Sequence, residues 1–253
     1  MLIDMHTHLW MGQDLSQNKR AMIKTSEIFG VDRIYLSSLG GFYPDEAEIT
    51  ELNRMTAQFM REEPGFVKGY CYLNPRHSNC MEELKRGIGE YGMSGVKLWV
   101  ATLCDDPLVF PIVEQCIRCN VPLLVHAFHK AVGQLEYESR GEHVARLANR
   151  YPEARLIMAH LGANPWRELR PVRGCNNVWT DFSGSIAHPD DLAYAKEMLG
   201  ANRLLFGTDM PDISFITSWG QFRDADFTPE ERERVAWRNA VELFEGGQRD
   251  EEN

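Results

Sequence analysis

Five side chains that could hold a metal ion are spread over the whole chain. His6 and His8 are two residues apart in a hydrophobic run near the N-terminus. On a β-strand that spacing points both imidazoles to the same face. His126, His160 and Asp209 each end a further aliphatic run. Imidazole nitrogens with one carboxylate suit Zn²⁺ or a similar divalent ion and leave a position for water. The residue types therefore predict metal chemistry.

The chemistry that such a site allows is specific. A bound divalent ion lowers the pKa of its water from about 15.7 to about 7, so hydroxide becomes available at neutral pH. A nearby carboxylate or imidazole can then remove the proton and pass it on. Asp209 could both contact the metal and hold this water. His160 could polarise an oxygen of the substrate or carry the proton.

These side chains must be positioned by strands, because each ends a short aliphatic or β-branched run that is followed by a polar break and a helical periodicity. We expect strands at residues 2–9, 33–39, 66–73, 95–101, 122–128, 155–161, 178–182 and 203–208. Eight strands that alternate with helices close into a (β/α)8 TIM barrel, an α/β fold. Barrel enzymes build their active sites at the carboxyl ends of the strands, where the histidines and Asp209 fall.

The helices between the strands follow the same alternation. We expect them at residues 16–29, 45–62, 79–90, 107–119, 138–150, 188–199 and 229–245, with a short irregular piece at 164–173. Pro165 and Pro171 bracket this irregular piece. The chain therefore reads as a single barrel domain over residues 1–246. Residues 247–253 are expected to form an acidic, disordered tail.

Composition excludes several classes of function. The net charge of −10 argues against a nucleic-acid partner, because a duplex-binding surface needs clustered Lys and Arg. No apolar stretch is long enough to span a membrane, and no signal peptide begins the chain, so the expected location is the cytoplasm. The six cysteines fall at no secreted-scaffold spacing, and Cys116 and Cys119 read as helix residues one turn apart.

At this point the chain resembles the amidohydrolase superfamily, in the amidohydrolase-2 branch that includes aminocarboxymuconate-semialdehyde decarboxylase. The resemblance covers nearly the whole chain and rests on seven segments in order: residues 3–8, 95–98, 125–126, 151–162, 177–183, 205–211 and 237–244. It implies one divalent metal, usually Zn²⁺ with Mn²⁺ as the alternative. The residues that match the family's ligands are His6, His8, His126 and Asp209, and His160 matches its catalytic histidine.

The leading hypothesis is a metal-dependent hydrolase that acts on a small polar amide, lactone or ester. The alternative is a non-oxidative decarboxylase of a small unsaturated or aromatic carboxylic acid. The chain is short for the decarboxylases of this branch, whose loops after the strands are longer. The loops that cover its substrate must therefore be smaller, or a second subunit of a homodimer must supply part of the cover. That shortness favours hydrolysis, although the identity of the small-molecule substrate stays open.

Two further classes of protein share some of these sequence features. A TatD-type deoxyribonuclease shares the His-x-His start. Such an enzyme has an acidic metal ligand near the middle of the barrel, whereas this chain has Lys97 there. A barrel that binds metal without turnover would be favoured by a lost ligand, and none of the five is missing. The chain is therefore expected to be an enzyme.

Lys97 lies on the expected fourth strand, where dinuclear relatives place a carboxylated lysine that bridges two metals. Carboxylation needs a neutral amine, whereas the pKa of a free lysine is about 10.4. Trp99 follows on the same face of the strand and crowds the space for a second ion. We therefore expect one metal, with Lys97 unmodified, pointing into the pocket and available to a substrate carboxylate or oxyanion.

Aromatic and apolar side chains that follow the strands are expected to line the pocket mouth: Trp10, Met11, Phe42, Tyr43, Trp99 and Trp166. Packing between strands and helices is the competing interpretation for each. Among the remaining histidines, His77 and His143 are expected to be solvated or structural. His129 and His188 fall in loops after the fifth and seventh strands, where lining a pocket and lying in solvent are both open.

Overall fold

The structure, a computed structural model, describes residues 1–184 and 187–246. Eight parallel strands form one sheet in the order β1-β2-β3-β4-β5-β6-β7-β8, which confirms the predicted alternation. The expected tail at 247–253 lies outside the described residues. The strands are Ile3–Trp10 (β1), Arg33–Leu39 (β2), Val67–Leu73 (β3), Gly95–Leu98 (β4), Leu123–Val125 (β5), Leu156–Met158 (β6), Val178–Asp181 (β7) and Leu204–Leu205 (β8).

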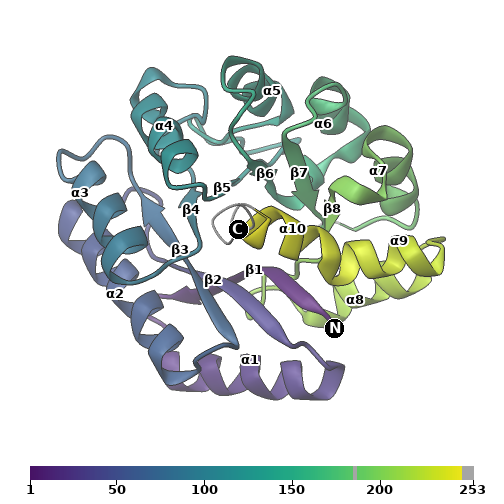
Figure 1. Ribbon diagram of the computed structural model, residues 1–253, viewed down its shortest axis with the longest axis horizontal. Coiled ribbons are helices and arrows are strands. Elements are labelled where there is room, and N and C mark those ends of the chain that lie inside the picture. The colour runs from purple at the N-terminus through teal and green to yellow at the C-terminus, as the bar shows by residue number, and fades with distance from the viewer. Residues whose placement is uncertain (185–186, 247–253) are drawn as a thin grey trace, which may run out of the picture.

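The sheet closes on itself where the segment after β8 meets β1. The Met5 amide donates to the Phe206 carbonyl at 2.9 Å, and the Asp209 amide donates to the His6 carbonyl at 2.7 Å. A parallel bridge joins Thr7 to Met210. The closed ring of strands surrounded by helices is visible in Figure 1. The fold is therefore the single-domain TIM barrel that the sequence predicts.

Helices follow the strands around the outside of the barrel (Figure 1). They are Leu15–Phe29 (α1), Glu46–Glu62 (α2), Cys80–Lys85 (α3), Phe110–Arg118 (α4), Gly141–Arg150 (α5), Pro165–Val172 (α6), Asp191–Leu199 (α7), Phe215–Asp224 (α8), Pro229–Glu233 (α9) and Asn239–Glu245 (α10). Short 3₁₀ or π segments occupy Arg86–Glu90, Pro107–Val109, Ala159–Ala163, Ala201–Arg203 and Arg234–Arg238. Within the described part of the chain, no helix has the length and apolar character needed to cross a membrane.

Two helices differ from expectation. Residues 215–224 form α8, where the sequence predicts no helix, because Ile216, Thr217 and Gly220 are poor helix formers. Tertiary packing stabilises α8 instead, since Phe215 stacks on Phe29 with ring centroids 4.6 Å apart. The irregular piece expected at 164–173 is a helix, α6, and Pro171 lies inside its last turn.

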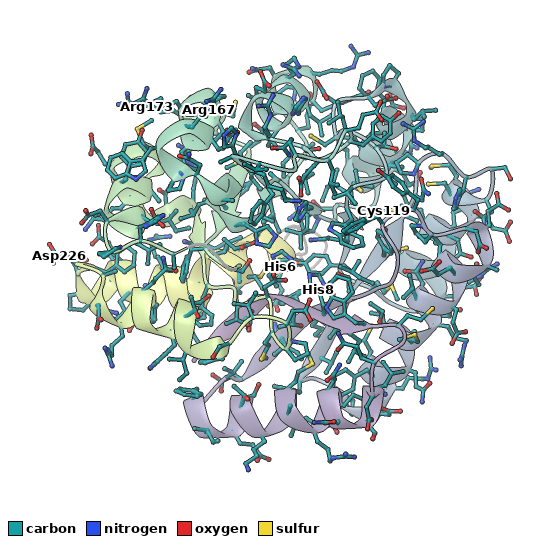
Figure 2. The ribbon with its side chains drawn as sticks, turned by 180° about the vertical axis from the view of Figure 1, so that it is seen from behind. His6, His8, Cys119, Arg167, Arg173 and Asp226 are labelled. Carbon is teal, nitrogen blue, oxygen red and sulfur yellow. The ribbon has the colours of Figure 1, made fainter. Side chains whose placement is uncertain are left out.

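The core has two layers. A large outer cluster lies between strands and helices, and a smaller inner cluster includes Ile3, Met5, Tyr35 and Tyr70. Residues of α10 pack on the inner cluster, and Figure 1 shows this helix across the centre of the ring. This end of the barrel is therefore filled with apolar side chains. The histidines must face the opposite end, and Figure 2 shows His6 and His8 near the centre of the ring from that side.

Candidate metal centre

An irregularity in β1 turns the two N-terminal histidines toward each other. Asp4 pairs with Ile34 but Thr7 pairs with Leu36, so β1 has one residue more than β2 over this stretch. An extra residue of this kind re-aims the side chains that follow it. Met5 can thus pack in the inner apolar cluster. His6 and His8 turn toward each other instead, and their Nε2 atoms lie 3.0 Å apart.

Asp209 joins these two histidines from the segment after β8. Its Oδ1 lies 3.2 Å from His8 Nε2 and 3.9 Å from His6 Nε2. One ligand atom from each of the three residues lies within 4.8 Å of the others. The backbone of Asp209 has φ 65°, a left-handed conformation that is uncommon for residues other than Gly. This conformation belongs to the turn that brings the carboxylate back to β1.

Fixed acceptors determine which nitrogen of each histidine faces the site. His6 Nδ1 lies 3.1 Å from Asp181 Oδ2, and His8 Nδ1 lies 3.0 Å from the Ser37 carbonyl. Carboxylate and carbonyl oxygens only accept, so both Nδ1 atoms carry the hydrogen and both Nε2 atoms carry a lone pair. Two lone pairs that face each other at 3.0 Å repel unless a cation lies against them.

His126 and His160 form a second pair, at the ends of β5 and β6. His126 Nδ1 lies 3.2 Å from His160 Nε2. Among the described residues, the ligand atoms of His126 are not part of the group that His6, His8 and Asp209 form within 4.8 Å. His126 nonetheless reaches the same site through His160: the His126 and His160 ring centroids are 5.0 Å apart, and the His160 ring stacks on the His6 ring with centroids 4.8 Å apart.

His160 begins a left-handed turn. His160, Leu161, Gly162 and Ala163 have φ values of 63°, 50°, 69° and 62°. Each non-Gly residue in this region costs about 1–2 kcal/mol. The turn ends β6 abruptly and directs the His160 ring back across the barrel. Strained backbone of this kind is common where a side chain must be held for function.

Asp181 and Ser183, at the end of β7, were not singled out as site residues from the sequence. Asp181 is fully buried, and its Oδ1 accepts from the amide of His160 at 3.1 Å and from the Ser183 hydroxyl at 2.5 Å. Ser183 Oγ in turn lies 2.9 Å from His160 Nδ1. Because these bonds and the contact with His6 occupy both Asp181 oxygens, we assign this carboxylate to positioning the histidines. Their only sequence signal is their place in the 177–183 segment.

Glu138 was also missed by the sequence analysis. It lies in the loop after β5, where it is buried, and its Oε1 lies 3.1 Å from His126 Nε2. Lys130 Nζ is 2.8 Å from the same oxygen, and Gln134 donates to Oε2 at 2.8 Å. Burial opposes ionisation of Glu138, but its bonds to His126 and Lys130 outweigh burial and lower its pKa. The hydrogen of His126 is therefore on Nε2, and Nδ1 faces the site.

Lys97 points into the same centre from β4. Its Nζ lies 3.0 Å from His6 Nε2, and the side chain is buried. Burial lowers the pKa of Lys97 to about 8, against the favourable charges of Asp209 and Asp181. The side chain therefore remains mostly an ammonium at neutral pH.

The protonation states fit a divalent cation. Burial, followed by the charge of Lys97, lowers the pKa of His6 well below its usual value, and burial also lowers the pKa of His126. For Asp209, burial favours the neutral acid, but the close contact with His8 and the other imidazoles around the carboxylate hold its pKa far below the usual range. Neutral imidazoles and an ionised carboxylate are the forms that ligate metals. The lone pairs of His6 and His8 and the Asp209 carboxylate therefore form a donor set that fits a divalent ion.

Aromatic rings surround the centre. Trp10 is 5.9 Å from the His8 ring and 5.4 Å from Trp99, and Trp99 also contacts Phe42 at 5.2 Å. Phe128 stacks on His126 at 5.8 Å. Trp99 also belongs to the outer core and Trp10 packs against it, so the lining of a pocket mouth by Trp10, Phe42 and Trp99 stays a prediction.

Met11 and Tyr43, which were also expected at the mouth, do not contact this centre. Met11 packs partly buried against the outer core, and Tyr43 is exposed. Trp166 is half exposed and stacks on Tyr194. His143 accepts from the amide of Arg140 at the start of α5, which is a structural role.

Comparisons with known proteins agree with this fold. A family model described as Amidohydrolase matches residues 3–246. A 2,6-dihydroxybenzoate decarboxylase from Rhizobium is 16% identical with a TM-score of 0.76, and the match covers 97% of this chain and 99% of that chain. A second similar structure is a 5-carboxyvanillate decarboxylase from Novosphingobium aromaticivorans, complexed with manganese and 4-hydroxy-3-methoxy-5-nitrobenzoic acid. It is 16% identical with a TM-score of 0.78, and the match covers 97% of this chain and 96% of that chain.

A third structure of the same fold is a 4-oxalomesaconate hydratase from Rhodopseudomonas palustris, 17% identical with a TM-score of 0.72, covering 97% of this chain and 96% of that chain. At these identities the likeness establishes the fold alone. No match to the sequence was found among curated proteins.

Proposed function

The chain belongs to the amidohydrolase family, and from that premise we propose that it is a metal-dependent, non-oxidative decarboxylase of a small aromatic or unsaturated carboxylic acid. The observation that carries the proposal is the buried ammonium of Lys97 among histidines whose rings contact aromatic side chains. Its Nζ lies 3.0 Å from His6 Nε2, and Trp99 and Phe128 contact His126 on the other side of the centre.

These groups suit both ends of an aromatic acid. Trp10, Trp99 and Phe128 offer flat apolar faces to a ring, and aromatic rings prefer such offset or edge-to-face contacts. The Lys97 ammonium offers a charged donor to a carboxylate that has lost its water on entering the barrel. Binding a carboxylate in a water-poor site favours loss of CO2, because neutral CO2 needs less solvation than the anion from which it forms.

The residues that would hold the metal are His6, His8 and Asp209, with His126 as the further ligand that the family resemblance implies. When bound, a divalent ion such as manganese or zinc would supply a Lewis acid for the oxygens of the substrate. Asp181, Ser37 and Glu138 hold the hydrogen of each imidazole on the nitrogen that faces away from this position.

The proton balance assigns a role to His160. When the bond between the ring carbon and the carboxylate breaks, the electron pair stays on that carbon and one proton must be added there. Ser183 lies 2.9 Å from His160 Nδ1, so Nε2 is the nitrogen left to take up a proton from solvent water and pass it to the carbon. Burial lowers the pKa of His160 to about 4, so an imidazolium formed there gives up its proton more readily than a free imidazolium does. CO2 leaves and the product retains a new C–H bond.

Hydrolysis of an amide, lactone or ester remains the second candidate. The same donors would bind an ion that lowers the pKa of water, and the chain's short loops favour a small, open substrate. Two of the three structures compared above are named decarboxylases, whereas the third is a hydratase. This supports decarboxylation over hydrolysis.

The test is a substrate panel with the purified protein supplied with Mn²⁺ or Zn²⁺. One arm contains 2,6-dihydroxybenzoate and 5-carboxyvanillate and measures CO2 release together with the new aromatic C–H signal by NMR. The other arm contains lactones and small amides and measures hydrolysis. The proposal expects turnover in the first arm that disappears in the His160→Asn variant. Turnover confined to the second arm would instead establish the hydrolase.

A further inference from the structure

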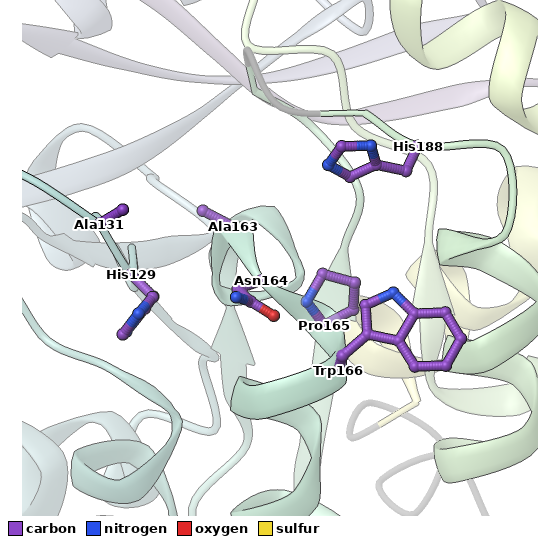
Figure 3. Close-up of a pocket in the computed structure, with 7 residues that line it drawn as sticks. All are labelled: His129, Ala131, Ala163, Asn164, Pro165, Trp166 and His188. Carbon is purple, nitrogen blue, oxygen red and sulfur yellow. The ribbon is translucent and has the colours of Figure 1, made fainter.

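A second pocket lies on the same end of the barrel as the metal centre. It has a cavity volume of about 460 Å³ and is lined by His129, Ala131, Ala163, Asn164, Pro165, Trp166 and His188 (Figure 3). The lining comes from the segments that follow β5, β6 and β7, the strands that carry His126, His160 and Asp181. The pocket therefore lies at the carboxyl ends of the strands that carry these residues, and Phe128, which contacts both His126 and His160, is on the same loop as His129.

His129, on the left in Figure 3, is held by contacts of its ring and of its backbone with neighbouring residues. Its Nδ1 lies 3.2 Å from Oε1 of the buried Glu168, although the ring is turned so that no aligned hydrogen bond forms. The other Glu168 oxygen accepts from the amide of Gly141 at 2.7 Å. The backbone of His129 also donates to the Gly162 carbonyl at 2.8 Å. Glu168 thus occupies the Nδ1 side of the imidazole and leaves Nε2 for a ligand.

The opposite walls are fixed as well. Trp166 stacks on Tyr194 with ring centroids 4.1 Å apart, which holds the exposed indole in place. His188 donates its backbone amide to the buried Asp191 carboxylate at 2.8 Å, at the start of α7. A pocket whose walls are held in this way binds a ligand without the cost of ordering them.

The polar groups of the pocket favour an acceptor oxygen. Among the described residues that line the pocket, none is acidic, whereas two carry imidazoles and one carries a carboxamide. Asn164 caps α6 through its backbone carbonyl, which accepts from Arg167 and Glu168, so its carboxamide makes no cap bond. The N-terminal end of α6 adds a partial positive charge. Ala131, Ala163 and Pro165 complete an apolar floor beside the Trp166 indole.

We propose that this pocket is a specificity subsite that binds the end of the substrate remote from the reacting carboxylate, and that it takes a ring substituent with an acceptor oxygen, such as a second carboxylate. This inference rests on the proposed function and names the substrate class more closely. His129 and Asn164 bind the oxygen, and Trp166 contacts the ring edge. The preferred substrate is then a dicarboxylic or similarly oxygenated aromatic acid.

Two ring acids of matched shape test the subsite. Isophthalate carries a second carboxylate where 3-methylbenzoate carries a methyl group. Each is titrated into the metal-loaded protein by calorimetry, and the resonances of ¹⁵N-labelled histidine side chains are followed by NMR. Because a charged hydrogen bond contributes about 1.5–3 kcal/mol, isophthalate should bind at least about ten times more tightly. The His129 and His188 resonances should shift with isophthalate alone.

Variants then locate the contact. His129→Asn and Asn164→Leu should each reduce the ratio of the two affinities toward one. Arg167→Gln is the matched control, because Arg167 lies beside the pocket and is exposed but does not line it. It should leave the ratio unchanged. If His129→Asn fails to fold because the buried Glu168 loses the His129 ring, Asn164→Leu still gives the answer. The contact between His129 and Glu168 is unchanged in Asn164→Leu.

The results separate this inference from the proposed function, because the binding measurements need no turnover. Equal affinities in the wild type, or a ratio that survives both pocket variants, would overturn the subsite even if the protein decarboxylates. Shifts of the His126 resonance without shifts of His129 would also overturn it. If the ratio and its loss are observed but CO2 is not released from any aromatic acid, the subsite stands and the decarboxylase proposal fails.

Discussion

Glu138 Oε1 lies 3.1 Å from His126 Nε2, although the two residues belong to different parts of the loop that follows β5. The carboxylate accepts the imidazole hydrogen and is itself held by Lys130 at 2.8 Å. This contact determines that His126 presents Nδ1 to the centre. Partners of this kind typically change metal affinity 10- to 100-fold when they are removed, about 1.4–2.7 kcal/mol.

We therefore predict that Glu138→Gln weakens metal binding by about 10- to 100-fold. Glutamine keeps the shape of the side chain but loses the negative charge that Lys130 and the imidazole require. Metal affinity is measured by competition with a chromophoric chelator. Glu136→Gln is the matched control, because Glu136 is exposed on the same loop. Equal affinities for these two variants would remove Glu138 from the site.

His6→Ala should abolish the stabilisation that a metal gives. A ligand at 100 times its dissociation constant stabilises the folded state by about 2.7 kcal/mol, which raises the melting temperature. The variant lacks the nitrogen that lies 3.0 Å from His8 Nε2, so added Mn²⁺ or Zn²⁺ should no longer raise its melting temperature. His77→Ala changes a histidine on the loop after β3 that belongs to neither candidate ligand group of the described residues, so it should keep the full shift. Full metal occupancy in His6→Ala would show that the ligand set is wrong.

His160→Asn should separate metal binding from turnover. The residue carries a proton in the proposed reaction, and loss of such a group lowers kcat by about 10²- to 10⁴-fold. The ligand atoms of His6, His8 and Asp209 form a group without it, so metal content should stay at the wild-type level. Metal analysis and turnover are measured on the same preparation. Loss of metal from this variant would make His160 a ligand.

The sequence was sufficient to predict the barrel and the residues at its strand ends, because both follow local rules. Alternation along a strand places His6 and His8 on one face, and Asp209 and His160 each end an aliphatic run. Their meeting follows from the closure of the barrel, which brings the segment after β8 to β1. The order of strands in a (β/α)8 fold is itself a strong constraint.

Glu138 and α8 could not be predicted in this way. Glu138 contacts His126 only because the loop folds back and pairs Ser139 with Ala127, and no periodicity in the sequence encodes that return. Helix α8 depends on aromatic packing against Phe29 rather than on helix propensity. Both depend on tertiary contacts between segments that a local pattern does not connect.

The left-handed turn after β6 predicts unequal effects on the stability of the fold at two adjacent residues. A Cβ added at Gly162 would lie 2.4 Å from Glu168 Cβ and would sit on a backbone with φ +69°, so Gly162→Ala should destabilise the fold by about 2–4 kcal/mol. Ala163 already bears the left-handed strain at φ 62°, so Ala163→Gly should stay within about 1 kcal/mol of the wild type. Urea unfolding measures both. Equal losses would show that this turn is not strained as described.

Lys97→Met should weaken substrate binding without removing the metal. The ammonium lies 3.0 Å from His6 Nε2, where it repels a cation and attracts a carboxylate. Removing the charge at nearly constant shape should leave metal affinity equal or higher. The KM for an aromatic acid should rise by about ten-fold or more, because a charged hydrogen bond contributes about 1.5–3 kcal/mol.

One metal per chain and an unmodified lysine mass should be found in the wild type. Two metals per chain, or a mass about 44 Da higher from one added carboxyl group, would instead indicate a bridged dinuclear site.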